Sequence, residues 1–259
     1  MLLCVDIGNT NVSCAVFEGD RIIFRFTFSS KEAGVPKKFG AFVRALFKSN
    51  NVEFSSIKKI AISSVVPGVT KTVSDECENF FKVKPFVVDK NTKTGLTLDL
   101  PKPEQLGADR IVNAVAVVNF FPNQNSIIVD IGTATTFCAL KNTVYLGGVI
   151  IPGPVTAMRS LNSATAQLPL VDIIKPSFVL GKDTEQNIQS GIYYGHLGAL
   201  KTIISKTRRE VFSGEKIVVI GTGGLVFLFK DEGVFTHVMP DLMMHGLRFL
   251  SKANSLSLR

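Results

Sequence analysis

Two segments of the chain place an aspartate, a glycine and small polar residues directly after a buried apolar run. Asp6 begins "DIGNTN", and Asp130 begins "DIGTATT" 124 residues later. Glycine allows the backbone to approach a ligand closely, and backbone amides with small hydroxyls suit phosphate oxygens. Because carboxylates repel phosphate, two of them indicate cations between the aspartates and a phosphorylated ligand. The alternative is that each aspartate only caps its own turn.

A third glycine-rich segment, "GTGG" at Gly221–Gly224, follows an apolar run that begins near Lys216. Such a turn could let an adenine ring lie flat against the backbone. No Lys-Ser or Lys-Thr follows it, so it is not a Walker A loop. The first strand is not followed by G-x-G-x-x-G either, which excludes a Rossmann fold.

The segment "GADR" at Gly107–Arg110 offers a carboxylate and a guanidinium just before an apolar run. Asp109 could act as a general base, cap the following helix or pair with Arg110. Arg110 suits bidentate binding of a carboxylate or a phosphate. Its alternative is a surface ion pair with Glu104 or Asp109.

The elements that position these residues occur twice along the chain. Each half opens with three predicted strands, between Leu2 and Phe28 and again between Ser126 and Ile151, and then mixes helices with strands. The match between the halves indicates a duplicated α/β unit. We therefore predict two domains, residues 1–115 and 116–259.

An ungapped alignment extends this match beyond the aspartate loops. It places Cys14-Ala15 opposite Cys138-Ala139 and the turn Glu18–Asp20 opposite Asn142–Val144. The paired strands and turns together favour duplication over chance.

A short later helix is predicted at Val155–Leu161, and apolar periodicity predicts three longer ones. These span Gly107–Phe120, Glu185–Arg209 and about Asp241–Lys252. The second one places Gly191, Gly195 and Gly198 on one side, where small residues permit close packing. This side is either a dimer contact or a seam between domains.

The composition excludes several classes of protein. The 259 residues are 46% hydrophobic and 19% charged, which is unlike a disordered chain. The cysteines are isolated from one another, which favours reduced thiols in a cytoplasmic protein. They are Cys4, Cys14, Cys77 and Cys138. The histidines lie far apart in sequence, which argues against zinc. They are His196, His237 and His245. We expect no signal peptide and no membrane span, since no apolar run approaches about 20 residues.

The net charge of +8 permits two interpretations. It is either a solvated basic surface or a field that attracts an anionic substrate such as a nucleotide. The lysines and arginines are scattered and do not alternate with aromatic residues, so we expect no nucleic-acid partner.

The two Asp-x-Gly loops and the late Gly-Gly turn resemble the actin, hexokinase and Hsp70 superfamily of ATP-binding proteins. Together with "GADR" and "GGVIIPG" at Gly147–Gly153, they are similar to type III pantothenate kinases. The resemblance implies duplicated ribonuclease H-like domains with mixed five-stranded sheets and a cleft between them. It implies ATP-dependent phosphorylation of pantothenate to 4′-phosphopantothenate, the first step of coenzyme A biosynthesis, by a cytoplasmic homodimer.

The resemblance also implies the roles of particular residues. The residues expected to bind ATP are Asp6, Ile7, Gly8, Asn9, Thr10, Asn11, Val12, Ser13 and Thr133. Those expected to bind pantothenate are Gly107, Ala108, Asp109, Arg110, Thr184 and Leu100. Asp109 would be the catalytic base. Asp130 would bind a monovalent cation, K⁺ or NH₄⁺, and Asp6 would bind Mg²⁺ through water.

Leu100 departs from the family pattern, which usually has tyrosine seven residues before the glycine of "GADR". One alternative is therefore a non-catalytic ATP-binding regulator on the same fold. Another is a different phosphotransferase, such as a sugar or acetate kinase, which the position of "GADR" opposes. An active enzyme is favoured by the presence of Asp6, Asp109, Arg110, Asp130 and Thr184.

Overall fold

The computed structural model describes residues 1–255, which form two compact units. The first unit contains residues 1–96, 101–120 and 242–255. The second contains residues 97–100 and 121–241. None of the helices in the described part of the chain has the length and apolar content of a membrane span.

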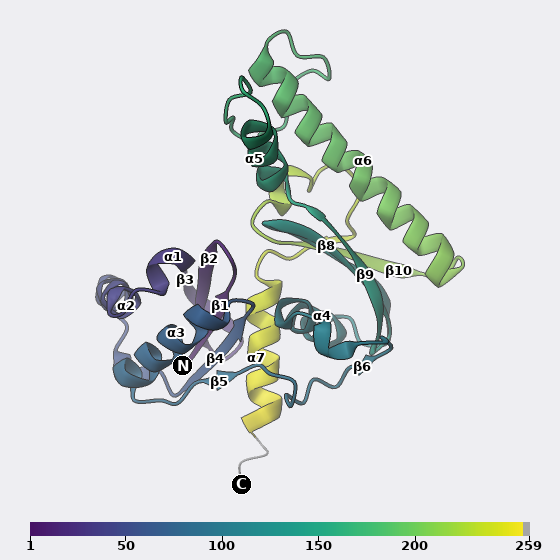
Figure 1. Ribbon diagram of the computed structural model, residues 1–259. Coiled ribbons are helices and arrows are strands. Elements are labelled where there is room, and N and C mark those ends of the chain that lie inside the picture. The colour runs from purple at the N-terminus through teal and green to yellow at the C-terminus, as the bar shows by residue number, and fades with distance from the viewer. Residues whose placement is uncertain (256–259) are drawn as a thin grey trace. The chain divides into compact units, whose positions relative to one another are not determined.

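The first unit is built on a five-stranded sheet (Figure 1). Its strands are β1 (Leu2–Ile7), β2 (Asn11–Glu18), β3 (Arg21–Ser29), β4 (Lys59–Ser64) and β5 (Phe86–Val87). They lie in the order β3-β2-β1-β4-β5. Strand β1 pairs antiparallel with β2 and parallel with β4, so this sheet is mixed as predicted.

Both faces of this sheet are covered by helices. One face packs against α1 (Ser30–Ala33), α2 (Lys38–Ser49) and α3 (Pro67–Phe81) through a core rich in phenylalanine. The other face packs against α4 (Ala108–Phe120) and α7 (Leu242–Ser255). Helices α4 and α7 cross closely, because Gly246 has no side chain to strike the carbonyl oxygen of Val112. Short 3₁₀ turns occur at Phe54–Ser56 (η1) and Pro103–Gln105 (η2).

The second unit is built on a six-stranded sheet. Its strands are β6 (Thr97–Leu98), β7 (Asn125–Ile131), β8 (Ala134–Lys141), β9 (Val144–Pro152), β10 (Ile217–Thr222) and β11 (His237–Val238). Their order is β11-β10-β7-β8-β9-β6. This sheet is mixed as predicted but has six strands rather than five, because β6, a two-residue strand, pairs with the start of β9.

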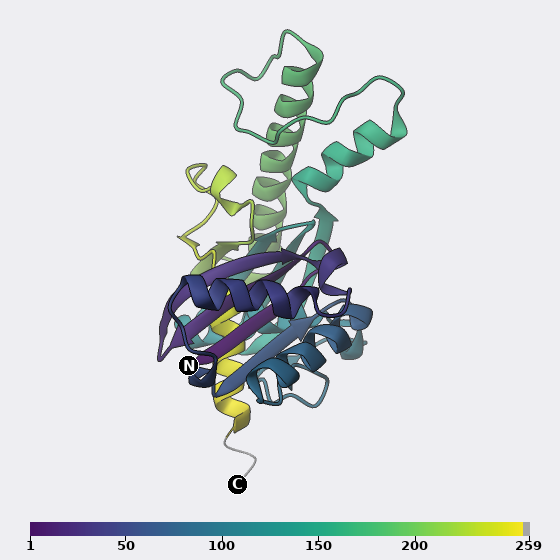
Figure 2. The ribbon, with the colours of Figure 1, turned by 90° about the vertical axis from the view of Figure 1, so that its left-hand side faces the viewer.

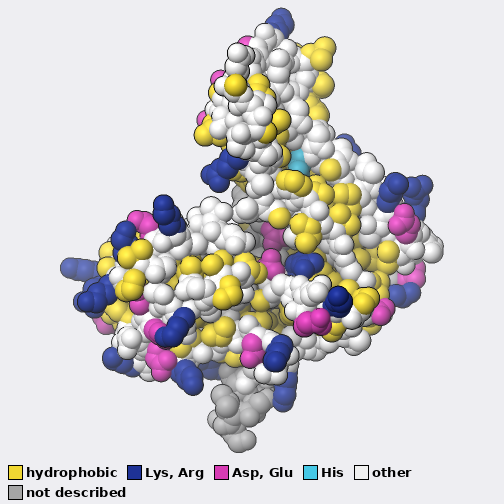
Figure 3. All heavy atoms as spheres, viewed as in Figure 1, with side chains coloured by type: hydrophobic (Ala, Val, Ile, Leu, Met, Phe, Trp, Pro, Cys, Tyr) yellow, Lys and Arg dark blue, Asp and Glu magenta, His cyan; other side chains and the backbone are white. Residues whose placement is uncertain are grey.

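Helix α6 (Thr184–Phe212) packs on one face of this second sheet. A long loop, residues 165–183, joins it to α5 (Pro154–Ala164), as Figure 2 shows. A 3₁₀ turn, η3 (Val226–Leu228), follows β10. Beyond its short pairing with β6, strand β9 exposes Val149 and Ile150, and Figure 3 shows hydrophobic side chains gathered over β8 and β9.

The duplication extends to the irregularities of the strands. A β-bulge interrupts β2–β3 after Val16, and another interrupts β8–β9 after Ala139. The hairpin turns contain Gly19 and Asn142, both with positive φ (59° and 53°). Bulges and turns at matching positions are features of a copied unit, because each depends on a local backbone conformation.

The register also corrects the sequence alignment. Asp6 pairs with Ser13, seven residues later, whereas Asp130 pairs with Thr136, six residues later. The second aspartate loop is therefore one residue shorter. Beyond the loop Cys138 is equivalent to Ala15, and the ungapped alignment is wrong by one residue.

Besides residues 97–100, which belong to the second unit, two helices depart from the predicted division at residue 115. Helix α4 stays whole in the first unit, and α7 joins that unit although it follows the second repeat. The reason is packing, since α7 buries Met244, Leu247 and Leu250 against the first sheet and α4.

Candidate active site

The first aspartate loop is closed by short hydrogen bonds within the first unit. The Gly8 amide donates to the Asn11 carbonyl at 2.9 Å, and the Ser30 hydroxyl donates to the Gly8 carbonyl at 2.6 Å. The Ser30 amide donates to the Thr10 carbonyl at 3.0 Å. These bonds fix the loop while Asn9, Thr10 and Asn11 remain exposed to a ligand.

Two of the predicted ATP-binding residues are oriented away from any ligand. Ile7 and Val12 are fully buried in the core between the sheet and helices α2 and α3. Only their backbone groups are available for nucleotide binding, whereas Asp6 and Ser13 are partly exposed on the opposite face.

The second aspartate loop is held by α5. The Thr133 carbonyl accepts hydrogen bonds from the Gly153 amide at 3.0 Å and from the Thr156 hydroxyl at 2.6 Å. A Cβ atom on Gly153 would clash with the Gly132 carbonyl oxygen and lie 2.8 Å from that of Thr133. The last glycine of "GGVIIPG" is therefore needed for this close approach. The Thr133 side chain remains exposed.

The turn Gly221–Gly224 packs directly on Asp130. Gly223 has φ +92°, and a Cβ atom there would clash with Asp130 Oδ1 and lie 2.6 Å from the Ile131 amide nitrogen. The Leu225 amide donates to the Ile131 carbonyl at 3.1 Å. This glycine thus supports the aspartate loop, while a Cβ atom on Gly224 would meet nothing within 4 Å.

Each aspartate lies in a row of three polar residues across its sheet. Asp6 pairs with Ser13 on β2 and Ser63 on β4. Paired residues on neighbouring strands point to the same face, about 5 Å apart. The Ser63 hydroxyl is buried and has no hydrogen-bond partner among residues 1–255.

The second unit repeats this row. Asp130 pairs with Thr136 on β8 and Thr222 on β10. Sequence reasoning missed Ser63 and Thr222 because it compared only the first strands and loops of the two halves. Extending the comparison to β4 and β10 would have found a hydroxyl residue beside each aspartate.

The segment Gly107–Arg110 forms the start of α4 in the first unit. Asp109 lies at the second helical residue, where the helix dipole favours a negative charge. Its side chain folds back over Gly107, where a Cβ atom would clash with Oδ1. Within the described chain, Asp109 and Arg110 make no ion pair and no side-chain hydrogen bond with each other or with Glu104.

Val65 connects the end of β1 with the start of α4. Its amide donates to the Ile7 carbonyl at 3.1 Å, and its Cγ1 would lie 3.9 Å from a Cβ atom on Gly107. The fold of the first unit therefore brings the Asp6 loop and the Asp109 turn to the same edge of the sheet.

Thr184 and Leu100, two predicted substrate contacts, belong to the second unit. Thr184 is exposed at the first residue of α6, where Asp183 caps the helix by accepting from the Gln186 amide at 2.8 Å. It lines a groove between α5 and α6. Leu100 is half-buried, next to Asp99, whose amide donates to the Tyr145 carbonyl at 2.9 Å.

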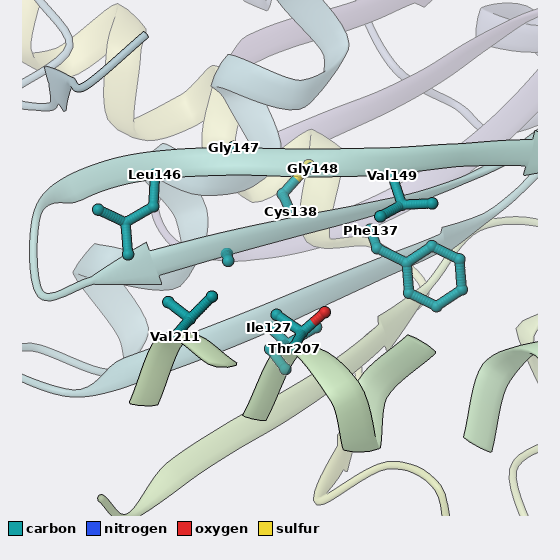
Figure 4. Close-up of a pocket in the computed structure, with 10 residues that line it drawn as sticks. Ile127, Phe137, Cys138, Leu146, Gly147, Gly148, Val149, Thr207 and Val211 are labelled. Carbon is teal, nitrogen blue, oxygen red and sulfur yellow. The ribbon is translucent and has the colours of Figure 1, made fainter. Parts of the chain in front are cut away.

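A separate cavity of about 220 Å³ lies between β8, β9 and the end of α6 (Figure 4). Its walls include Ile127, Phe137, Thr207 and Val211, and no charged side chain lines it. Ile127 and Phe137 point to the α6 face of the sheet, whereas Asp130 points to the other face. This cavity is therefore not part of the aspartate site.

No group of three His, Cys, Asp or Glu side chains in residues 1–255 is arranged to hold a metal ion alone. A cation at Asp6 or Asp130 would need further oxygen ligands. The hydroxyls in each row, backbone carbonyls, water and nucleotide phosphates are oxygen donors of the kind that Mg²⁺ and alkali cations take. The residues present fit such ions.

Comparison with known proteins identifies the family. The family model for type III pantothenate kinase matches residues 2–206. The chain belongs to the type III pantothenate kinase family. A type III pantothenate kinase from Legionella pneumophila (strain Corby) is 43% identical over 256 residues, covering 98% of this chain and all of that protein. The kinase is also 40% identical over 255 residues to type III pantothenate kinase 1 of Francisella tularensis subsp. holarctica (strain OSU18), with 98% and 100% covered.

The fold is also similar to that of proteins with low sequence identity to this chain. MreB 5 of Spiroplasma citri, solved bound to AMPPNP, superposes with a TM-score of 0.54 at 9% identity, over 99% of this kinase and 97% of that chain. At this identity the likeness shows the fold alone. It confirms the duplicated actin-like architecture that the two Asp-x-Gly loops predicted.

Proposed function

We propose that this chain transfers the γ-phosphoryl group of ATP to the primary hydroxyl of pantothenate, with Asp109 as the base. The observation that carries the proposal is the Asp109 carboxylate at the start of α4. It is not neutralised by a neighbouring cation in the described chain, and Val65 connects its turn to the end of the Asp6 strand. A carboxylate so placed can accept the proton of the attacking hydroxyl.

The other residues of the first unit orient the reactants. The exposed amides and hydroxyls of Asn9, Thr10 and Asn11 donate to phosphate oxygens. Arg110, on the same helical turn as Asp109, binds the pantothenate carboxylate or a phosphate through two parallel hydrogen bonds. The hydroxyl oxygen attacks the γ-phosphorus, its proton passes to Asp109, and ADP leaves with the displaced oxygen.

Two cation sites accompany the nucleotide. Asp6, with the hydroxyls of Ser13 and Ser63 in its row, would hold Mg²⁺ through water. Asp130 would hold K⁺ or NH₄⁺ beside Thr133. Bound cations would neutralise part of the phosphate charge. Without them, the negative charges of ATP and of the two carboxylates would repel each other.

The surface around α5 and α6 supports the proposal of a homodimer. Gly191, Gly195 and Gly198 face solvent, and a Cβ atom on any of them would meet nothing within 4 Å. The loop before α6 exposes Phe178 (79%) and Leu180 (85%). Such an exposed apolar surface is typical of a protein–protein contact. Because Thr184 follows this loop directly, a second copy that packs here would also lie close to Thr184.

The dimer is tested by size-exclusion chromatography with light scattering. We expect dimers for the wild-type chain and monomers for Leu180→Asp. Val35→Asp, at an exposed apolar residue of the first unit (43%), is the control and should remain dimeric. A wild-type monomer would contradict this part of the proposal.

The activity is tested by measuring ADP release with and without pantothenate, in K⁺ and then in Na⁺. We expect release that requires pantothenate and is faster in K⁺. ATP binding without pantothenate-dependent turnover would point to a regulator, and turnover with a sugar or acetate instead would point to another phosphotransferase.

A further inference from the structure

A buried hydrogen bond connects α6 to the second aspartate loop. His196 Nε2 lies 3.1 Å from the Thr135 hydroxyl oxygen, and both side chains are buried. Thr135 is the second residue of β8, and the loop residues Gly132 and Thr133 come directly before that strand. The bond therefore crosses from the core helix to the strand that carries the loop.

The surroundings of His196 keep its imidazole ring neutral. The Phe229 ring lies 5.3 Å from the imidazole and stacks on Tyr193, which is one helical turn before His196 on α6. Burial lowers the pKa of His196 to about 4, so the imidazole is neutral at the pH of a living cell. A neutral ring offers one donor and one acceptor, and the Thr135 hydroxyl can satisfy either.

The other sides of the loop are already fixed by contacts described above. Gly153 and Thr156 bind the Thr133 carbonyl, and Leu225 binds the Ile131 carbonyl. Thr135 is the remaining stem residue, and its side chain points away from the ligand side into the core. Without a side-chain bond there, only backbone hydrogen bonds, those of the strand pairing and the one from the Gly132 amide to the Ala134 carbonyl, would hold this end of the loop.

The pair of His196 and Thr135 is not needed merely to fill this part of the core. Phe137 and Ala139, which point to the same face of β8, are apolar and buried. Replacing both partners of a buried hydrogen bond by apolar groups of similar shape is often nearly neutral for stability. A histidine and a threonine in this core thus indicate a role beyond filling space.

We propose that His196 is a positioning residue for the kinase. Through the Thr135 hydroxyl it holds the Asp130–Thr133 loop in the conformation that receives the ATP phosphates and the monovalent cation. This inference rests on the proposed role of that loop in phosphoryl transfer.

The test compares variants that break the bond with variants that keep it. Thr135→Val removes the bond with little change in shape, and His196→Phe removes it with a larger apolar ring. Thr135→Ser keeps the hydroxyl, and His196→Gln keeps a polar group of similar reach. His237→Gln, at an exposed histidine, is the control. For each variant we would measure KM for ATP and for pantothenate, the K⁺ concentration for half-maximal activity, ATP binding by calorimetry, and the melting temperature.

We expect the bond-breaking variants to raise KM for ATP and the K⁺ requirement by about two- to twelvefold, the range for one neutral hydrogen bond. KM for pantothenate should stay the same, and Thr135→Ser should match wild type. The double variant Thr135→Val with His196→Phe should be no worse than either single one. A lower melting temperature with unchanged constants, or equal shifts for both substrates, would overturn the proposal.

Calorimetry separates this proposal from the proposed function. If the wild-type chain binds ATP but does not phosphorylate pantothenate, the reaction assignment fails. Weaker ATP binding by Thr135→Val than by the wild-type chain in calorimetry would still support the role of His196.

Discussion

Gly153→Ala is the most direct test of how the second aspartate loop is built. The added Cβ atom would clash with the Gly132 carbonyl oxygen and lie 2.8 Å from that of Thr133. Ordinary contacts of this kind are longer than about 3.4 Å, and the obstacle is backbone rather than a mobile side chain. The loop must therefore move away from α5.

Two effects follow from this displacement. Overpacking in a tight site costs about 1–3 kcal/mol of stability. The movement also misplaces the groups that face ATP, and a shift of about 1 Å at a reactive site reduces the rate by up to about 100-fold. We expect a folded protein with a lower melting temperature, a kcat/KM for ATP reduced by about 10- to 100-fold, and a higher K⁺ requirement.

The assay is steady-state ADP release at varied ATP and K⁺, together with thermal unfolding. Gly68→Ala in α3 is the matched control, because a Cβ atom there would meet nothing within 4 Å. It should keep wild-type kinetics. If Gly153→Ala also keeps wild-type kinetics and melting temperature, then either the loop accommodates the methyl group or the loop does not bind ATP, and the reasoning fails.

Four further predictions concern single residues. Asp109→Asn should still bind ATP in calorimetry but turn over at least about 100-fold more slowly, and near-normal turnover would remove it as the base. Asp130→Ala should lose both activity and the response to K⁺ in a salt titration, whereas full wild-type activity without K⁺ or NH₄⁺ would argue against a cation there. Leu100→Tyr should lower KM for pantothenate by about two- to twelvefold and leave KM for ATP unchanged, since one hydrogen bond is added; a lower melting temperature with no kinetic change would place Leu100 outside the substrate site. The pKa of His196, about 4 in the folded chain against about 6.5 unfolded, means that protons bind the unfolded state more tightly, so stability is lost as the pH falls from about 6.5 towards 4. Chemical denaturation of His196→Phe should show a weaker loss of stability over this pH range than that of the wild-type chain, and an equal loss would argue against His196 as its cause.

The aspartate loops were predictable because their chemistry is local. Asp6 and Asp130 are each followed by glycine and small polar residues, and a strand ending in such a turn has few other uses. The start of α4 at "GADR" and the length of α6 followed equally from local patterns. The sequence therefore predicted the duplicated fold and the elements that carry the candidate site.

The residues that were missed depend on pairing between distant segments. Ser63 lies beside Asp6 only because β4 pairs with β1, and Thr222 lies beside Asp130 only because β10 pairs with β7. The bond between His196 and Thr135 joins residues 61 positions apart. Nothing in the sequence near any of these residues specifies its partner, since strand order and helix packing are set by the whole core.

The packing of α7 on the first sheet has a consequence for synthesis of the chain. Strands β1 to β5 and helix α4 leave the ribosome first, but the apolar surface formed by Cys4, Ala61 and Val112 is covered in part by Leu247 and Leu250 of α7. That surface stays open until α7 has been made, and α7 is made only after every residue of the second unit. The first unit to be translated is thus the last to be completed.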